Sequence, residues 1–133
     1  MNILFICRYN KFRSKLAEAF LNKHSDQHTA KSAGIIRGSP VDDPIIRCGL
    51  RNGVNVGGVS KGVDVPLLRW QDMIVIVADD VPEALFEDNE TVYGKRLMHW
   101  MIPDVKNGDP AEMDKTAQSI EKKVLDLLND IAS

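Results

Sequence analysis

The sequence predicts an α/β fold in which a parallel sheet of four strands is flanked by helices on both faces. Two observations support this prediction. Short apolar runs rich in β-branched residues alternate with segments whose apolar residues recur at helical spacing. No internal repeat or linker interrupts the 133 residues, so we expect a single domain over residues 1–133.

The first third of the chain contains two expected strands and one helix. Residues 2–6 form a continuous apolar run that stops at a polar turn, which is typical of a short buried strand. Residues 14–23 have an amphipathic pattern, with Ser14 as the expected helix N-cap. A second strand is expected at residues 29–33 and ends at Gly34.

The middle of the chain begins with a turn-rich loop, GSPVDDP, followed by a helix expected at residues 45–52. Pro44 suits the start of that helix and Gly53 suits its end. Residues 55–63 are glycine-rich, which favours an irregular loop.

The second half predicts the remaining strands and helices. The run DMIVIVA is the strongest strand signal in the chain, and the final segment has apolar residues in helical register. The expected elements are one helical turn at 65–70, a strand at 72–78, a short helix at 81–86, a strand at 95–100 and a long helix at 113–131.

Composition excludes several classes of function. The net charge is −2, with 17 basic and 19 acidic side chains mixed along the chain, so we expect no nucleic-acid partner and no membrane surface. The apolar run at the N-terminus is too short for a signal peptide or a membrane span. The two cysteines, Cys7 and Cys48, have neither metal-ligand nor disulfide spacing. We therefore expect no metal, a free thiol at Cys7 and a cytoplasmic location.

Cys7 directly follows the first expected strand and precedes a loop that holds Arg8, Lys11 and Arg13. Ligands of open parallel sheets bind at the carboxyl ends of the strands. Backbone N–H groups at a helix N-terminus bind oxyanions, and nearby cations favour the thiolate form of a cysteine. Arg13 can offer two parallel donors to a phosphate, and the Ser14 hydroxyl can hydrogen-bond the sulfur. These residues predict phosphoryl transfer through a phosphocysteine.

A plainer interpretation is that Cys7 is a small buried apolar residue, as many cysteines at strand ends are. The spacing C-x-x-x-x-x-R-S arises often by chance. Its position, directly between a strand and an amphipathic helix, is far less frequent by chance and favours a catalytic role.

The stretch ILFICRYNKFRSKLAEAF resembles the amino terminus of low-molecular-weight protein tyrosine phosphatases and of the related thioredoxin-coupled arsenate reductases. Cys7, Asn10, Arg13, Ser14 and the residues LAEA match the family pattern. SAGI, GSPVDDP and HWMIPDV resemble later family motifs in the same order. The resemblance covers most of the chain.

The resemblance implies the family's sheet of four parallel strands, with no metal or organic cofactor. It implies that Cys7 is the nucleophile, Arg13 the phosphate clamp, and Asn10 and Ser14 organisers of the loop. An aspartate late in the chain would act as acid and then as base. We expect this to be Asp104, although Asp109 keeps the family's Asp-Pro dipeptide.

Four positions depart from the family pattern. Tyr9 stands where the phosphatases commonly have glycine, and Phe12 where many have a second cysteine. Val105 and Lys106 replace the aromatic residues that sandwich a phosphotyrosine ring. Tyr9 or Trp70 could take their place, although Trp70 equally suits the core. The substrate-binding residues are expected to be Arg8, Tyr9, Asn10, Lys11, Phe12 and Ser14.

The leading hypothesis is a cysteine-dependent phosphatase acting on phosphotyrosine in proteins or on small aryl and alkyl phosphates, as a monomer or weak dimer. One alternative is an arsenate reductase. It would need an external thiol, because residues 79–97 lack the two cysteines of the thioredoxin relay. Another is an oxyanion- or phosphopeptide-binding module without catalysis. A sugar-transport phosphocarrier is disfavoured, since it needs no arginine clamp. Cys48 is expected to pack in the core.

Overall fold

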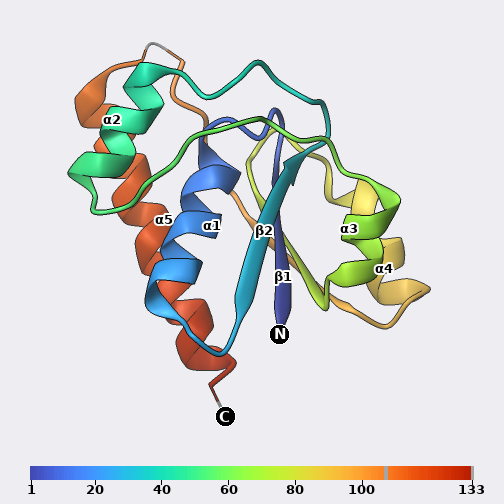
Figure 1. The fold of residues 1–133 in the computed structure, drawn as a ribbon. Coiled ribbons are helices and arrows are strands. Elements are labelled where there is room, and N and C mark those ends of the chain that lie inside the picture. The colour runs from blue at the N-terminus through green and yellow to red at the C-terminus, as the bar shows by residue number, and fades with distance from the viewer. Residues whose placement is uncertain (107, 133) are drawn as a thin grey trace.

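A computed structural model describes residues 1–106 and 108–132 of the protein. Its four strands form one parallel sheet with the order β2-β1-β3-β4. Figure 1 shows β1 and β2 side by side. The strands are β1 (Asn2–Cys7), β2 (Thr29–Gly34), β3 (Met73–Val77) and β4 (Arg96–Trp100). The predicted fold class is therefore confirmed.

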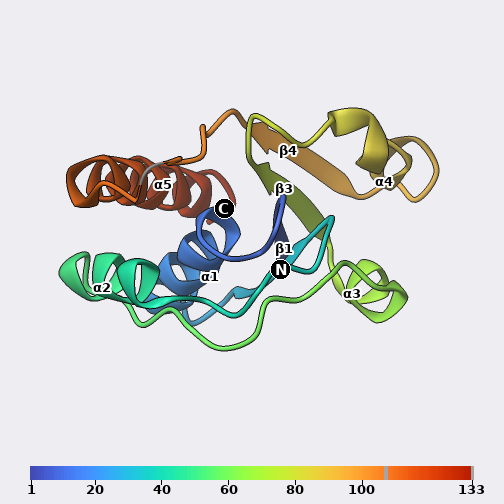
Figure 2. The same ribbon diagram turned by 90° about the horizontal axis from the view of Figure 1, so that it is seen from above.

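Helices cover both faces of the sheet, as Figure 2 shows. One face carries α1 (Arg13–His24), α2 (Asp43–Arg51) and α5 (Pro110–Asp130). The other carries α3 (Val65–Trp70), the 3₁₀ turn η1 (Glu83–Phe86) and α4 (Asp88–Thr91). In the described part of the chain, no helix combines the length and the apolar character that crossing a membrane requires.

The sheet has an apolar core on each side because successive side chains of a strand point to opposite faces. Phe5 belongs to the core beneath α1, α2 and α5, whereas Leu4 and Ile6 belong to the core beneath α3 and η1. All three are fully buried. Burying each such side chain contributes about 1.5–3 kcal/mol, so β1 is firmly held within the sheet.

Three expected boundaries are wrong for local reasons. Helix α1 begins at Arg13 with Phe12 in the N-cap position, so Ser14 is not the cap. Helix α5 begins at Pro110 because the Asp109 carboxylate caps it, accepting a hydrogen bond from the N–H of Ala111. The segment expected as one helix at residues 81–86 is the 3₁₀ turn η1, and a separate helix, α4, follows it.

Cys48 packs in the core, as expected. Its side chain is fully buried on α2, where the Sγ–H donates to the Asp114 carboxylate of α5. Burial and this hydrogen bond raise the pKa of the Cys48 thiol to about 11. The thiol is therefore neutral at physiological pH and a poor nucleophile.

The sheet topology directs the carboxyl end of β1 toward a ligand site. After β1 the chain adds β2 on one side and later β3 on the other, so β1 lies at the point where the strand order reverses. Crevices outside the carboxyl ends of strands at such switch points bind ligands. Cys7 is the last residue of β1.

Candidate active site

Residues 8–12 form the loop that joins β1 to α1. The segment after β2 runs beside it, and Ile35, Ile36 and Gly38 donate backbone hydrogen bonds to the carbonyls of residues 7, 8 and 9. A Cβ atom at Gly38 would lie 2.7 Å from the Tyr9 carbonyl oxygen, so only glycine permits this approach. The loop is thereby held against a neighbouring segment.

Asn10 holds the loop from inside. It adopts a left-handed conformation, with φ of 55°, which asparagine tolerates better than most residues. Its side chain is fully buried, and its Oδ1 accepts a hydrogen bond from the backbone N–H of Lys61. Its Nδ2 donates to both Ser14 Oγ and Ser32 Oγ, at 2.9 Å each. A single side chain therefore fixes the curvature of the loop.

This network sets the direction of the Ser14 hydroxyl. Ser32 donates its own proton to Glu18 Oε1, 2.6 Å away, so Ser32 Oγ is the acceptor toward Asn10. Ser14 Oγ likewise accepts from Asn10, which leaves its proton free to point at Cys7 Sγ, 3.0 Å away. A hydrogen bond donated to sulfur stabilises the thiolate over the thiol.

The loop also offers backbone donors. Among the described residues, the N–H groups of residues 9–12 donate no hydrogen bond to another protein atom. The N-terminus of α1 follows directly and adds partial positive charge. Free N–H groups beside a helix N-terminus suit an oxyanion such as phosphate.

Arg13 is buried at the first position of α1, with 2% of its surface exposed. Its Nη1 donates to the carbonyl of Ile102 and its Nη2 to Asp80 Oδ1, both at 2.9 Å. Asp79 Oδ1 lies 3.6 Å from Nη1. These contacts hold the guanidinium by its two terminal nitrogens and leave Nε–H without a hydrogen bond within the described chain. The Nε edge of the guanidinium can therefore bind a ligand.

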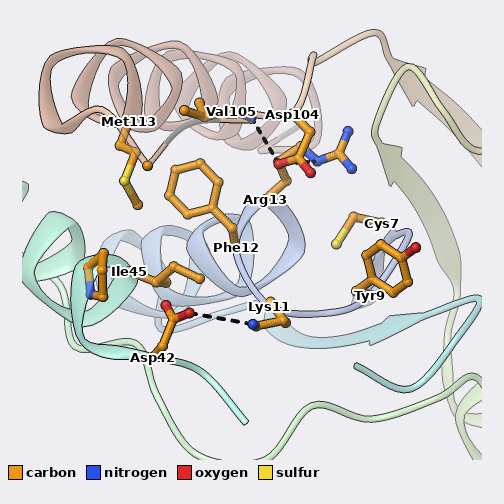
Figure 3. Close-up of a pocket in the computed structure, with 12 residues that line it drawn as sticks. Cys7, Tyr9, Lys11, Phe12, Arg13, Asp42, Ile45, Asp104, Val105 and Met113 are labelled. Carbon is orange, nitrogen blue, oxygen red and sulfur yellow. Dashed lines mark hydrogen bonds and ion pairs between the residues drawn. The ribbon is translucent and has the colours of Figure 1, made fainter. Parts of the chain in front are cut away.

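Cys7 and Arg13 line the same cavity, which has a volume of about 340 Å³ (Figure 3). Side chains from α2 and from the start of α5 form its far wall, so segments distant in sequence border the cavity. The lining residues are Cys7, Tyr9, Lys11, Phe12, Arg13, Asp42, Pro44, Ile45, Asp104, Val105, Gly108 and Met113.

The two candidate acids have different surroundings. Asp104 lines the cavity, and its Oδ1 lies 3.9 Å from Arg13 Nε. Its side chain is 43% exposed, so a proton can reach it from solvent. Asp109 does not line this cavity and caps α5 instead. Of the two carboxylates, Asp104 is therefore the one that shares a cavity with the cysteine.

Comparisons with known proteins identify the family of the chain. The family model for low molecular weight phosphotyrosine protein phosphatases matches residues 2–133. The chain belongs to this family. It is 32% identical, over 94% of both chains, to a low molecular weight protein-tyrosine-phosphatase, Ptp, from Acinetobacter johnsonii.

Solved structures share the fold of this family member. A low molecular weight protein tyrosine phosphatase from T. tengcongensis superposes with a TM-score of 0.86 at 20% identity, covering 98% of this chain and 99% of that one. An arsenate reductase from Archaeoglobus fulgidus has a TM-score of 0.75 at 23% identity, covering 96% and 98%. Both likenesses concern the fold alone.

The other residues expected to bind substrate fall into two groups in this family member. The side chains of Tyr9, Lys11 and Phe12 line the cavity, and Lys11 pairs with Asp42 at 3.5 Å. The side chains of Arg8, Asn10 and Ser14 do not line it, so Asn10 and Ser14 support the loop from beneath.

Trp70 cannot replace the aromatic residues that the family places at this site. It ends α3, and its carbonyl accepts a hydrogen bond from Asn2 at the amino end of β1, opposite Cys7. Lys31 Nζ lies 4.5 Å from the centre of its ring. Trp70 is therefore neither a site residue nor a buried core residue, since its side chain is partly exposed.

The sequence did not reveal several residues that position the site. Asp79 and Asp80 follow the carboxyl end of β3, and Ser32 and Glu18 complete the Asn10 network. The position of the two aspartates directly after a predicted strand was the available signal. In the described residues, no cluster of three or more histidine, cysteine or acidic side chains could hold a metal ion.

Proposed function

We propose that the protein hydrolyses phosphomonoesters through a phosphocysteine at Cys7. The main observation is that a cysteine with a fixed hydroxyl donor, an anchored arginine and a solvent-accessible carboxylate meet in one cavity. Membership of the phosphatase family supports the same reaction. The substrates would be phosphotyrosine in proteins or small phosphate esters, and a free cysteine nucleophile suits the reducing cytoplasm.

In the first step, the Cys7 thiolate attacks phosphorus and the ester P–O bond breaks. The free N–H groups of residues 9–12 and the Nε edge of Arg13 bind the non-bridging oxygens, where negative charge develops. Asp104, in its protonated form, gives its proton to the departing oxygen. The products are an alcohol or phenol and phosphorylated Cys7.

In the second step, the Asp104 carboxylate removes a proton from water and the water oxygen attacks phosphorus. The S–P bond breaks and the electron pair returns to sulfur. The Ser14 hydroxyl, 3.0 Å from Sγ, stabilises the departing thiolate. Inorganic phosphate is released and Asp104 is again protonated.

Rapid mixing with an aryl phosphate tests the proposal directly. We expect a burst of phenol equal to the enzyme concentration when hydrolysis of the phosphocysteine is slower than its formation. Acid quenching followed by peptide mass spectrometry should place the phosphate on Cys7. Binding of phosphate without turnover would instead show a binding module, and arsenate reduction without ester hydrolysis would show a reductase.

Substituting the two candidate acids should separate their roles. Asp104→Asn should slow hydrolysis of phenyl phosphate by about 10²- to 10⁴-fold, because phenolate is a poor leaving group without a proton donor. The loss should be smaller for 4-nitrophenyl phosphate, whose leaving group needs no proton. Steady-state kinetics with the two substrates provide the measurement.

Asp109→Asn is the matched control because asparagine caps helices as well as aspartate does. It should leave both rates unchanged. Equal losses for the two substrates in Asp104→Asn, or a leaving-group effect in Asp109→Asn, would remove Asp104 from the proposed role.

A further inference from the structure

Tyr9 is the only aromatic side chain of the cavity lining that is substantially exposed within the described chain. Its surface is 39% exposed, whereas Phe12, the other aromatic lining residue, is 7% exposed and packs into the core. Figure 3 shows the Tyr9 ring beside Cys7 and the Phe12 ring farther along the cavity. An exposed aromatic ring next to the sulfur has a free surface to offer to a ligand.

The backbone of Tyr9 is held in place by two glycines, Gly34 at the end of β2 and Gly38 in the segment after it. A Cβ atom at Gly34 would lie 2.8 Å from the Tyr9 carbonyl carbon, and one at Gly38 would lie 3.0 Å from Tyr9 Cβ. Gly38 N–H also donates to the Tyr9 carbonyl at 3.2 Å. The position from which the ring projects is therefore well defined.

Arg8 braces the ring from outside the cavity. Its guanidinium carbon lies 5.1 Å from the centre of the Tyr9 ring, a cation–π contact, and Arg8 is not a lining residue. Asp80 Oδ2 lies 3.9 Å from Arg8 Nη1, while Asp80 Oδ1 binds Arg13. The Asp80 carboxylate thus interacts with both Arg8, which contacts the Tyr9 ring, and Arg13.

Beyond the oxyanion site the cavity has an apolar wall alongside the charged side chains of Lys11, Asp42 and Asp104. Ile45, Val105 and Met113 provide its far wall, and Phe12 lies among them (Figure 3). The volume of about 340 Å³ falls in the range of sites that bind small organic molecules, roughly 300–1,000 Å³. The cavity can therefore accept an organic group attached to the phosphate.

We propose that Tyr9, braced by Arg8, forms the wall against which the leaving group stacks, and that it makes the site select phosphates borne by a flat aromatic group. This inference rests on the proposed function for the position of the phosphate. Because aromatic groups stack on one another, an aryl group gains contact with Tyr9 that a small alkyl group lacks. Tyr9 is then the specificity-determining residue of the site.

Competitive inhibition by phosphonates tests the proposal without requiring turnover of the probe. Phenylphosphonate and methylphosphonate share one anionic head group, so the ratio of their affinities measures what the phenyl ring adds to binding. The wild-type protein should prefer phenylphosphonate by roughly tenfold, the upper part of the range for an aromatic pair. Inorganic phosphate, measured in parallel by calorimetry, reports on the oxyanion site alone.

Variants at Tyr9 should change the ratio of the two phosphonate affinities and leave the affinity of the oxyanion site for phosphate unchanged. Tyr9→Leu, which keeps bulk but removes the ring, should bring the ratio close to one while phosphate affinity is retained. Tyr9→Phe should keep the ratio, and Arg8→Gln should lower it partway. Tyr93→Ala, just after the end of α4 and 70% exposed, is the control and should change nothing.

The outcomes separate this inference from the proposed function. An unchanged ratio in Tyr9→Leu, or equal losses of phosphate and phenylphosphonate, would overturn the role of Tyr9. If the wild-type protein turns over aryl phosphates but binds phenylphosphonate and methylphosphonate equally well, the proposed hydrolase activity stands and the preference for aryl groups is wrong. A ratio near ten without turnover would support the subsite and contradict the hydrolase.

Discussion

Cys7→Ser is expected to lower kcat for aryl phosphates by about 10⁴-fold or more, the scale seen when a nucleophile is removed. A serine hydroxyl is not ionised at neutral pH, and nothing in the network around Cys7 supplies a base to activate it. The Ser14 hydroxyl lies 3.0 Å from the sulfur at position 7 and accepts a hydrogen bond from Asn10, so it is available as a donor to that position. That donor stabilises a thiolate and cannot remove a proton.

Cys48→Ser is the matched control for Cys7→Ser. Cys48 is equally buried but lies between α2 and α5, outside the cavity, and the raised pKa of its thiol keeps it neutral. Its replacement should leave kcat per folded molecule unchanged, with folding checked by circular dichroism. Retained turnover in Cys7→Ser, or loss of turnover in Cys48→Ser, would contradict the assignment.

The second large effect is expected at Arg13. Arg13→Lys should lower kcat by about 10³-fold, because an ammonium keeps the charge but cannot present two parallel donors. It also cannot reproduce the anchors to Ile102 and Asp80, so the fixed position of the side chain in the cavity would be lost. Affinity for inorganic phosphate, measured by calorimetry, should fall less than kcat, since stabilisation is greatest in the transition state.

Arg51→Lys provides the corresponding control. Arg51 forms a bidentate pair with Asp114 on the outer side of α2 and α5, and its side chain is 40% exposed. Exposed pairs contribute about 0.2–1 kcal/mol, so this variant should fold and retain its kcat. If Arg13→Lys kept most of the activity, the guanidinium fork would not be the phosphate clamp.

The strands, the main helices and the cysteine loop could be predicted from the sequence because each depends on local pattern. Apolar runs specify β1 and β3, helical spacing specifies α1 and α5, and the spacing of Cys7 and Arg13 places both on one turn. Arg13 follows Cys7 by six residues, so the loop between them needs no distant segment to bring the two together.

The remaining parts of the site depend on contacts between segments far apart in the chain. Arg13 is bound by Asp80, 67 positions later, and Asn10 by the backbone of Lys61, 51 positions later. Only the folded chain shows that Asp104 shares the cavity while Asp109 caps a helix. Asp109 caps α5 for a local reason, but the position of Asp104 beside Cys7 depends on how its loop folds back over the carboxyl end of β1. Local sequence pattern thus determined the fold and placed Cys7 and Arg13 on one loop, whereas tertiary packing decided which carboxylates surround them.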